Sequence, residues 1–184
     1  SLCGNGIRWN PFKCHNRKGV YKSTDAGKSW RHSGLKKVGQ IGAVEIHPLN
    51  TKIIFVAAIG QVFQSNMERG VFRSNDGGET WEHVLFISDT IGVSDIEFNP
   101  DDPETIYAAA WRVERKPWTI ISGGQLGGIY KSTDGGNSWK LKRDGLPPDL
   151  IGKIDLAVSS ADPNRLSAIV EAPGDYGGLY RPDN

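Results

Sequence analysis

Hydrophobic residues in this chain occur in short runs between turn residues, and these runs predict β-strands rather than helices. The segments IIFVAAI (53–59) and TIYAAAW (105–111) are rich in β-branched, aromatic and other apolar residues, which is typical of strands buried on both faces. Glycine, proline, asparagine and aspartate cluster between the runs, where they favour tight turns. No long segment keeps a helical period. The pattern therefore predicts an all-β chain.

One pattern occurs three times along the chain. Its copies are GVYKSTDAGKSW (19–30), GVFRSNDGGETW (70–81) and GIYKSTDGGNSW (128–139), and a fourth copy, GLYR, begins at Gly178. A second element repeats in step, because the turns that begin HPLN and NPDD each precede one of the apolar runs. A repeat of about 50 residues with several short strands in each copy is typical of β-propeller blades. We therefore expect four-stranded antiparallel blades.

The repeat divides the chain into four parts. We expect the outer strands of a first blade in 1–38, complete second and third blades in 39–86 and 87–143, and the inner strands of a fourth blade in 144–184. The strands predicted for the two complete blades are 43–46, 53–59, 70–74 and 80–85, then 93–98, 105–111, 128–132 and 138–141. Known propellers have four to eight blades. About three blades' worth of strands therefore predicts an incomplete ring, either as part of a larger protein or as a chain that self-associates.

The most regular part of the repeat is Ser-x-Asp-x-Gly-x-x-Trp, and each residue type has a structural reason. Aspartate accepts hydrogen bonds from turn amides, glycine supplies a positive φ, and tryptophan starts the outer strand and buries a large ring beside its neighbour. We interpret the aspartates as turn braces rather than acid catalysts. The structural positions are Ser23, Asp25, Gly27, Trp30, Ser74, Asp76, Gly78, Trp81, Ser132, Asp134, Gly136 and Trp139.

This spacing is the Asp-box, and the sequence resembles the Asp-box (BNR-repeat) propellers. That family includes sialidases, xyloglucan-cleaving glycoside hydrolases, the luminal domain of sortilin and photosystem II assembly factor propellers. The chain is most similar to bacterial sortilin-like and BNR-repeat glycosyl hydrolase-like proteins, through GVYKSTD, the junction RGVF (69–72) and YAAAW followed by a basic loop. The resemblance implies a propeller fold and a secreted protein, extracellular or periplasmic. Because such propellers host catalysis, peptide binding and assembly, it implies no single activity.

Ligand-binding residues are expected at the end of the blades opposite the Asp-box turns, where the loops between second and third strands lie. The loop 112–127 offers guanidinium, ammonium and indole groups that suit a carboxylate, a sulfate or a sugar face. The loop 60–69 offers amides for polar ligands. The alternative for both loops is solvation with local ion pairs. The candidate binding residues are Arg112, Arg115, Lys116, Trp118, Gln64, Asn66 and Arg69.

A glycosidase would need a pair of carboxylates about 5–10 Å apart, one with a raised pKa. Asp89, Glu68 and Glu114 are weak candidates, because none lies in a motif that matches sialidases or xyloglucanases. Asp89, in a connection between blades, is the best single candidate, and its alternative is a turn brace. No nucleophile elbow or Ser/His/Asp arrangement is recognisable.

The amino-acid composition limits the classes of partner that we expect for this chain. With 22 Lys+Arg against 21 Asp+Glu, the net charge of +1 argues against nucleic acid, and no apolar run is long enough to span a membrane. Cys3 and Cys14 lack metal-ligand spacing and are expected as two thiols or one local disulfide, so we expect no metal and no cofactor. The charge is uneven, however, because residues 1–40 carry nine basic residues and one acidic residue. This asymmetry would favour self-association.

The leading hypothesis is a non-catalytic propeller module that binds a protein, peptide or carbohydrate ligand on its loop face. It rests on intact scaffold motifs without a recognisable catalytic constellation. One alternative is part of a BNR-repeat glycoside hydrolase, sialidase-like or xyloglucanase-like, with carboxylate acid/base chemistry. A second alternative is an assembly scaffold.

Overall fold

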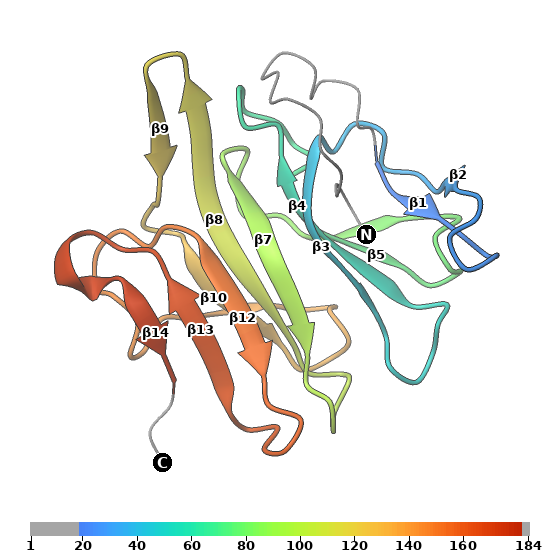
Figure 1. Ribbon diagram of the computed structural model, residues 1–184. Helices are drawn as coiled ribbons and strands as arrows, with labels where there is room; N and C mark the ends of the chain where they lie inside the picture. The colour runs from blue at the N-terminus through green and yellow to red at the C-terminus, as the bar shows by residue number, and fades with distance from the viewer. Residues whose placement is uncertain (1–18, 182–184) are drawn as a thin grey trace.

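The computed structural model describes residues 19–181, and this part of the chain is all-β apart from one 3-10 turn, η2 (Gly174–Tyr176) (Figure 1). The strands form successive antiparallel sheets along the chain. Among the described residues, no helix has the length and apolar character needed to cross a membrane. Cys3, Cys14 and the beginning of the predicted first blade lie outside the described residues.

The two central sheets have the strand order of propeller blades. The first has the order β3-β4-β5-β6, formed by β3 (Gln40–Ile46), β4 (Ile54–Gly60), β5 (Gly70–Ser74) and β6 (Glu82–Leu85). The second has the order β7-β8-β10-β11, formed by β7 (Ile91–Phe98), β8 (Ile106–Lys116), β10 (Gly128–Ser132) and β11 (Lys140–Lys142). We call them the second and third blades.

Smaller sheets flank these two blades. On one side β1 (Tyr21–Lys22) pairs with β2 (Arg31–His32), and we call this pair the first blade. On the other side the fourth blade has the order β12-β13-β14, formed by β12 (Ile154–Val158), β13 (Leu166–Val170) and β14 (Gly178–Tyr180). The all-β, partial propeller predicted from the repeat is therefore confirmed.

The core lies between successive blades, because β4 and β8 are buried on both faces as their uninterrupted apolar runs predict. Phe55 on β4 packs edge-on against Phe98 on β7, with ring centroids 5.6 Å apart. Tyr107 lies on the face of β8 that is turned toward the fourth blade, and it joins Ile154 in the hydrophobic cluster between the third and fourth blades. Each central strand thus contributes to two interblade cores.

Glycines on the innermost strands allow the second and third blades to approach each other closely. A Cβ on Gly42 would lie 2.2 Å from the carbonyl oxygen of Ser94, and a Cβ on Gly92 would lie 2.3 Å from that of Ile59. No side chain fits at such a distance, so β7 can pass this close to β3 at Gly42, and to β4 at Gly92, only with glycine there. On the other side of β7, Ser94 Oγ donates a hydrogen bond of 2.9 Å to the carbonyl oxygen of Ile154.

Two sequence expectations need correction. The segment 112–127 is not simply a loop, because β8 continues to Lys116 and pairs with β9 (Thr119–Ser122) as a hairpin. The outer strands β6 and β11 begin after the Asp-box tryptophan rather than before it. In both boxes the residue before that tryptophan still belongs to the turn, since its backbone N–H donates to the box aspartate.

Candidate functional site

The β8–β9 hairpin is the most prominent feature of the loop end of the molecule (Figure 1). Its strands pair from Val113 opposite Ser122 to Lys116 opposite Thr119, and Pro117 and Trp118 form the turn between them. Proline favours a turn at this position because its φ is already fixed. The Trp118 side chain is left 82% exposed at the tip. An indole in this position can contact a ligand without any rearrangement of the fold.

A row of charges runs along one face of this hairpin, as the two-residue period of a strand dictates. Arg112 Nη2 lies 3.1 Å from Glu114 Oε1, and Lys116 Nζ lies 3.2 Å from Glu114 Oε2. These hydrogen bonds, first from Arg112 and then from Lys116, lower the pKa of Glu114. Glu114 is therefore held as a carboxylate, unsuited to act as a general acid, and the row keeps one positive charge in excess.

Arg69 differs from the other candidate binding residues because it is completely buried. Its Nη2 donates to the carbonyl oxygens of Gln61 at 2.6 Å and Val113 at 3.2 Å, and its Nη1 donates to that of Thr90 at 3.1 Å. These carbonyls belong to three segments that are distant in the sequence. Arg69 thus ties the loop end of the second blade to the third. From the sequence we expected its guanidinium to be available to a ligand, but it is buried.

The amides of the loop 60–69 are partly used within the loop. Asn66 Oδ1 accepts a hydrogen bond of 3.2 Å from Arg69 Nε, and its Nδ2 donates to Glu68 Oε2 at 3.4 Å. Gln64 is exposed and donates from Nε2 to Gln61 Oε1 at 2.6 Å. Of these side chains, Gln64 is the one that the structure leaves at the surface.

The carboxylates named as weak catalytic candidates each have contacts of their own at the loop end. Asp89 is exposed and is linked to this loop by its backbone, since its carbonyl oxygen accepts from Asn66 N at 3.0 Å. Glu68 Oε2 accepts a hydrogen bond from Asn66 Nδ2, and the Glu114 carboxylate forms ion pairs with Arg112 and Lys116. Arg115 lies on the hairpin face opposite Glu114, and its backbone N–H donates to Val62 O at 2.6 Å.

The carboxyl groups with raised pKa values lie elsewhere, on the innermost strands. Glu45 on β3 and Glu97 on β7 occupy equivalent positions, as each precedes by two residues the first residue of a repeated turn. Burial and the nearby charges of Glu45 and Asp95 raise the pKa of Glu97 to about 7. Burial also raises the pKa of Asp95, which accepts a 2.7 Å hydrogen bond from Leu156 N. This cluster was not predicted from the sequence, although the repeated position of Glu45 and Glu97 is visible in the chain.

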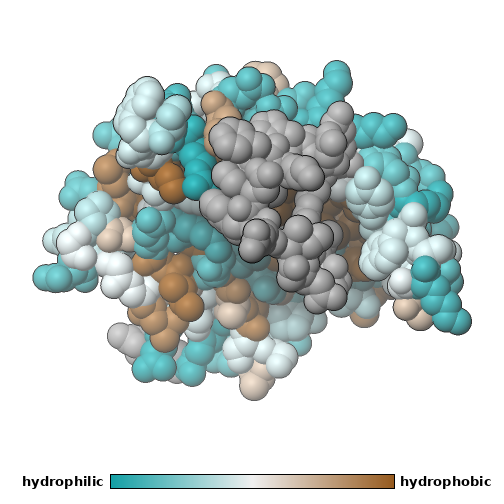
Figure 2. Space-filling view, turned by 45° about the horizontal axis from the view of Figure 1, so that its top comes forward, coloured by the Kyte–Doolittle hydropathy of each residue, from teal (hydrophilic) through white to brown (hydrophobic). Residues whose placement is uncertain are grey.

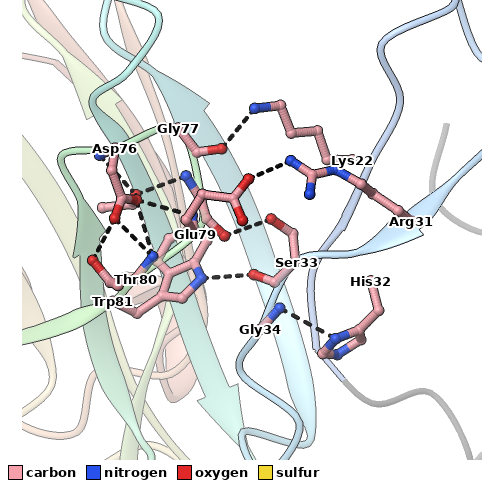
Figure 3. Close-up of polar contacts among 12 residues, drawn as sticks. Lys22, Arg31, His32, Ser33, Gly34, Asp76, Gly77, Glu79, Thr80 and Trp81 are labelled. Carbon is pink, nitrogen blue, oxygen red and sulfur yellow. Dashed lines mark hydrogen bonds and ion pairs between the residues drawn. The ribbon is translucent and has the colours of Figure 1, made fainter.

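The Asp-boxes are compact hydrogen-bonded turns (Figure 3). In the second box, Asp76 Oδ1 accepts from Ser74 Oγ at 2.8 Å and from the backbone N–H of Thr80 at 2.9 Å, while Oδ2 accepts from Thr80 Oγ1 at 2.5 Å. Hydrogen bonds from Thr80 and Ser74 lower the pKa of Asp76, so the carboxylate stays ionised. Gly78 has a φ of +92°. These contacts fit a turn brace and leave no proton for acid catalysis.

The boxes of the first and third blades repeat this arrangement. The pKa of Asp25 and that of Asp134 are each lowered to about 2, first by the hydroxyl of Ser29 and of Ser138 respectively. The tryptophans differ more: Trp81 Nε1 donates to Ser33 O at 2.7 Å across the blade interface, whereas Trp30 is 56% exposed. Trp30 has no preceding blade among the described residues.

Comparison with known proteins agrees with this architecture. The photosystem II assembly lipoprotein Ycf48 of Nostoc sp. (strain PCC 7120) is 30% identical over 145 residues, which cover 68% of this chain and 42% of that protein. The GH74 xyloglucanase from Xanthomonas campestris has a TM-score of 0.68 at 19% identity, over 91% of this chain and 26% of its own. An ancestral GH74 enzyme has a TM-score of 0.63 at 22% identity, over 91% and 20%.

These structural likenesses concern the fold, and the chain spans less than half the length of the curated relatives that it matches. The resemblance to Asp-box propellers drawn from the sequence is nevertheless confirmed at the level of the family. The model of the Sortilin-Vps10 family (sortilin, neurotensin receptor 3) matches residues 18–165, four-fifths of the chain. The chain therefore belongs to the Sortilin-Vps10 family.

Proposed function

We propose that this chain is a non-catalytic propeller module that binds a protein or peptide ligand at its loop end. The observation that carries the proposal is Trp118, 82% exposed at the tip of a hairpin that extends β8 beyond the blade. Large exposed aromatic side chains are costly to leave in water and are enriched in the centres of protein interfaces.

The surroundings of Trp118 indicate the chemistry of the ligand. Ile120 on the same hairpin is 55% exposed, and the charged row contributes two cations against one carboxylate. In the parts of Figure 2 that are not grey, hydrophobic residues occur as patches between hydrophilic areas. Such a surface suits an extended segment with an apolar or aromatic side chain next to an acidic residue.

The names of the relatives support a role in binding. The Ycf48 relative is named as an assembly lipoprotein, which favours a protein partner over a soluble sugar. We extend the proposal to a secreted location, extracellular or periplasmic, on the strength of that name and of the family. Fractionation of the native host tests this part, since recovery of the chain only in the cytoplasmic fraction would contradict it.

The binding proposal is tested by screening the purified chain against an immobilised library of acidic peptides with an aromatic residue, and in parallel against a glycan array. The matched control for Trp118→Ala is Leu49→Ala, because Leu49 is 83% exposed at the opposite end of the molecule. We expect peptide binding that Trp118→Ala weakens at least tenfold and Leu49→Ala leaves unchanged. Equal loss in both variants, or binding of glycans alone, would contradict the proposal.

A glycoside hydrolase remains the second candidate function, because of the inner-strand carboxyls. A group with a pKa of about 7, such as that of Glu97, is the kind of general acid that a glycosidase uses, with Asp95 as the neighbouring carboxylate. This hypothesis is tested by incubating the chain with xyloglucan and with sialosides and measuring the release of reducing sugars. Hydrolysis that Glu97→Gln abolishes would support catalysis, and no hydrolysis by the wild-type chain would remove it.

We also propose that the chain self-associates through the outward face of the fourth blade, with a second copy as the occupant. Ile169 and Leu179 form a cross-strand pair and are 61% and 67% exposed. The equivalent pair in the second blade, Ala57 and Val71, is completely buried against the next blade. Sedimentation velocity should show a dimer that Leu179→Asp dissociates and Leu49→Asp does not. A wild-type chain that is monomeric at about 100 μM would contradict this proposal.

A further inference from the structure

At the other end of the molecule, the Asp-box turns of the second and third blades are each fastened to the blade before them. Between the first and second blades, Lys22 Nζ donates a 2.8 Å hydrogen bond to the carbonyl oxygen of Gly77, in the turn of the second box (Figure 3). The N–H of Gly77 donates in turn to the carbonyl oxygen of Lys52, at 2.7 Å, in its own blade. The turn is therefore held from both sides, by a cation of one blade and a carbonyl of the next.

The same arrangement recurs one blade later. Arg73 Nη1 donates to the carbonyl oxygen of Gly135 at 2.7 Å, and the N–H of Gly135 donates to that of Glu104 at 3.0 Å. The next glycine of this turn lies on an aromatic ring, because a Cβ on Gly136 would come within 2.8 Å of Phe55 Cε1. A cation, a carbonyl and an aromatic ring thus form a receptor for the turn.

The third blade presents the same receptor toward the fourth. Lys131 stands in GIYK where Lys22 and Arg73 stand in GVYK and GVFR. It pairs across the strands with Tyr107, as Arg73 pairs with Phe55. The ammonium group of Lys131 lies 5.4 Å from the centre of the Tyr107 ring.

The third element of the receptor is the carbonyl of Asn164. Asn164 and Glu104 occupy equivalent places in the repeated turn, because each comes directly before a residue whose carbonyl oxygen closes that turn. The Arg165 oxygen accepts from Ser159 N at 3.1 Å, and the Thr105 oxygen accepts from Asn99 N at 2.9 Å. A polar cavity of about 420 Å³ opens here, lined by Lys131, Tyr107 and Asn164 among others.

We infer that this cavity is a binding site for an Asp-box turn, and that its occupant is a hairpin with the chemistry Asp-Gly-Gly followed by a tryptophan and a β-strand. The Lys131 ammonium would donate to the first glycine's carbonyl, the second glycine would lie on the Tyr107 ring, and the turn N–H would donate to Asn164. The strand of the occupant would pair with β14, which is the edge of a sheet of three strands where the two central blades have four. This site lies at the end opposite the proposed ligand surface and does not depend on it.

A peptide with the sequence of residues 132–143, STDGGNSWKLKR, is the probe. It carries a fluorescent label and is titrated with the 184-residue chain while anisotropy is recorded. The control peptide has Gly136→Val, because the backbone at this position has a φ of +84°, which valine disfavours, and because a Cβ there would meet the aromatic ring. The protein variants are Lys131→Met, which removes the ammonium but keeps the stem, and Lys140→Met, which removes an equal charge from the neighbouring strand.

We expect saturable binding by the wild-type chain and none of the control peptide. Loss of one charge-assisted hydrogen bond predicts about a tenfold higher Kd for Lys131→Met, and Lys140→Met should change Kd less than about twofold. Far-UV circular dichroism of each variant verifies the fold. Equal weakening by both lysine variants would show nonspecific electrostatic attraction and overturn the inference, as would a wild-type chain that does not bind the peptide.

Discussion

Arg69 Nη2 donates a 3.2 Å hydrogen bond to the carbonyl oxygen of Val113, and this contact joins the loop end of the second blade to the base of the β8–β9 hairpin. The guanidinium is completely buried, and its other N–H groups donate hydrogen bonds to further loop carbonyls and to Asn66. The hairpin that carries Trp118 is thus positioned by a completely buried residue. In our proposal Arg69 positions this end of the molecule, and Trp118 contacts the ligand.

Replacement of this residue should be among the most damaging single changes in the chain. Arg69→Met keeps an unbranched apolar stem but leaves several buried carbonyls without donors, so we expect a loss of about 3 kcal/mol in the free energy of unfolding. Urea denaturation measures it. Arg112→Met is the control, because the side chain of Arg112 is 40% exposed and its ion pair contributes little. Equal losses in the two variants would contradict the role assigned to Arg69.

Glu97 should make the stability of the fold depend on pH. Because its pKa is raised from 4.5 to about 7 in the folded protein, the folded state keeps a proton that the unfolded chain loses between these values. Wild-type stability therefore falls as pH rises from about 4.5 to 7. Glu97→Gln cannot ionise, and should be more stable than wild type by about 1 kcal/mol at pH 8, a value reduced for partial exposure, and no more stable at pH 4.

Thermal denaturation at these two pH values measures the effect of Glu97→Gln. Asp101→Asn, in an exposed turn of the same blade, is the control and should show no such pH-dependent gain. If Glu97→Gln lowers the melting temperature at pH 8, the like-charge cluster is not a source of repulsion.

The Asp-box carboxylates should act in the opposite direction. The pKa of Asp134 is lowered to about 2, so its contribution to stability is present above the ordinary value of 3.8 and is lost as pH falls toward 2. Asp134→Asn should therefore lower the melting temperature at pH 7, and the difference from wild type should shrink at pH 2.5. Asp175→Asn, in the exposed turn η2, serves as the comparison. A difference that is independent of pH would argue against an ionised brace.

Gly136 and Gly145 have nearly the same φ, so substituting each of them distinguishes the cost of backbone strain from the cost of a steric clash. Gly136 has a φ of +84° and Gly145 a φ of +79°, but a Cβ would meet Phe55 only at Gly136, with nothing within 4 Å at Gly145. Gly145→Ala should cost about 1 kcal/mol for the positive φ alone, and Gly136→Ala about 2–3 kcal/mol. Chemical denaturation of both variants gives the difference. Similar costs would mean that the box turn can move away from the ring.

The sequence predicted the blades well because their signals are local. The copies of the Asp-box and the apolar runs that become β4 and β8 each lie within a dozen residues, and a repeat multiplies such signals. The β8–β9 hairpin was missed because Arg112 to Lys116 alternates charges with few apolar residues, which is also typical of a solvated loop. Its strand character depends on pairing with β9, a contact that the local pattern does not show.

The site residues were harder to predict because their roles depend on neighbours distant in the chain. Arg69 in a polar loop is typical of a ligand contact, and its burial follows from carbonyls at positions 90 and 113 that only the fold brings near. The raised pKa of Glu97 likewise depends on the passage of β3 beside β7, which places Glu45 close to it. Residue type and position were visible, but the surroundings that set accessibility and charge were not.

The hydrogen bonds from Lys22 to Gly77 and from Arg73 to Gly135 also give the molecule a direction. In both, the earlier blade supplies the cation and the later blade supplies the turn. Because synthesis runs from the N-terminus, we expect Lys22 and Arg73 to be translated before the turns that they bind, so that each of these turns can dock on a blade already made. Local unfolding should follow the opposite order, because the third blade can detach without breaking the bond between Lys22 and Gly77, whereas loss of the first blade removes that bond from the turn of the second.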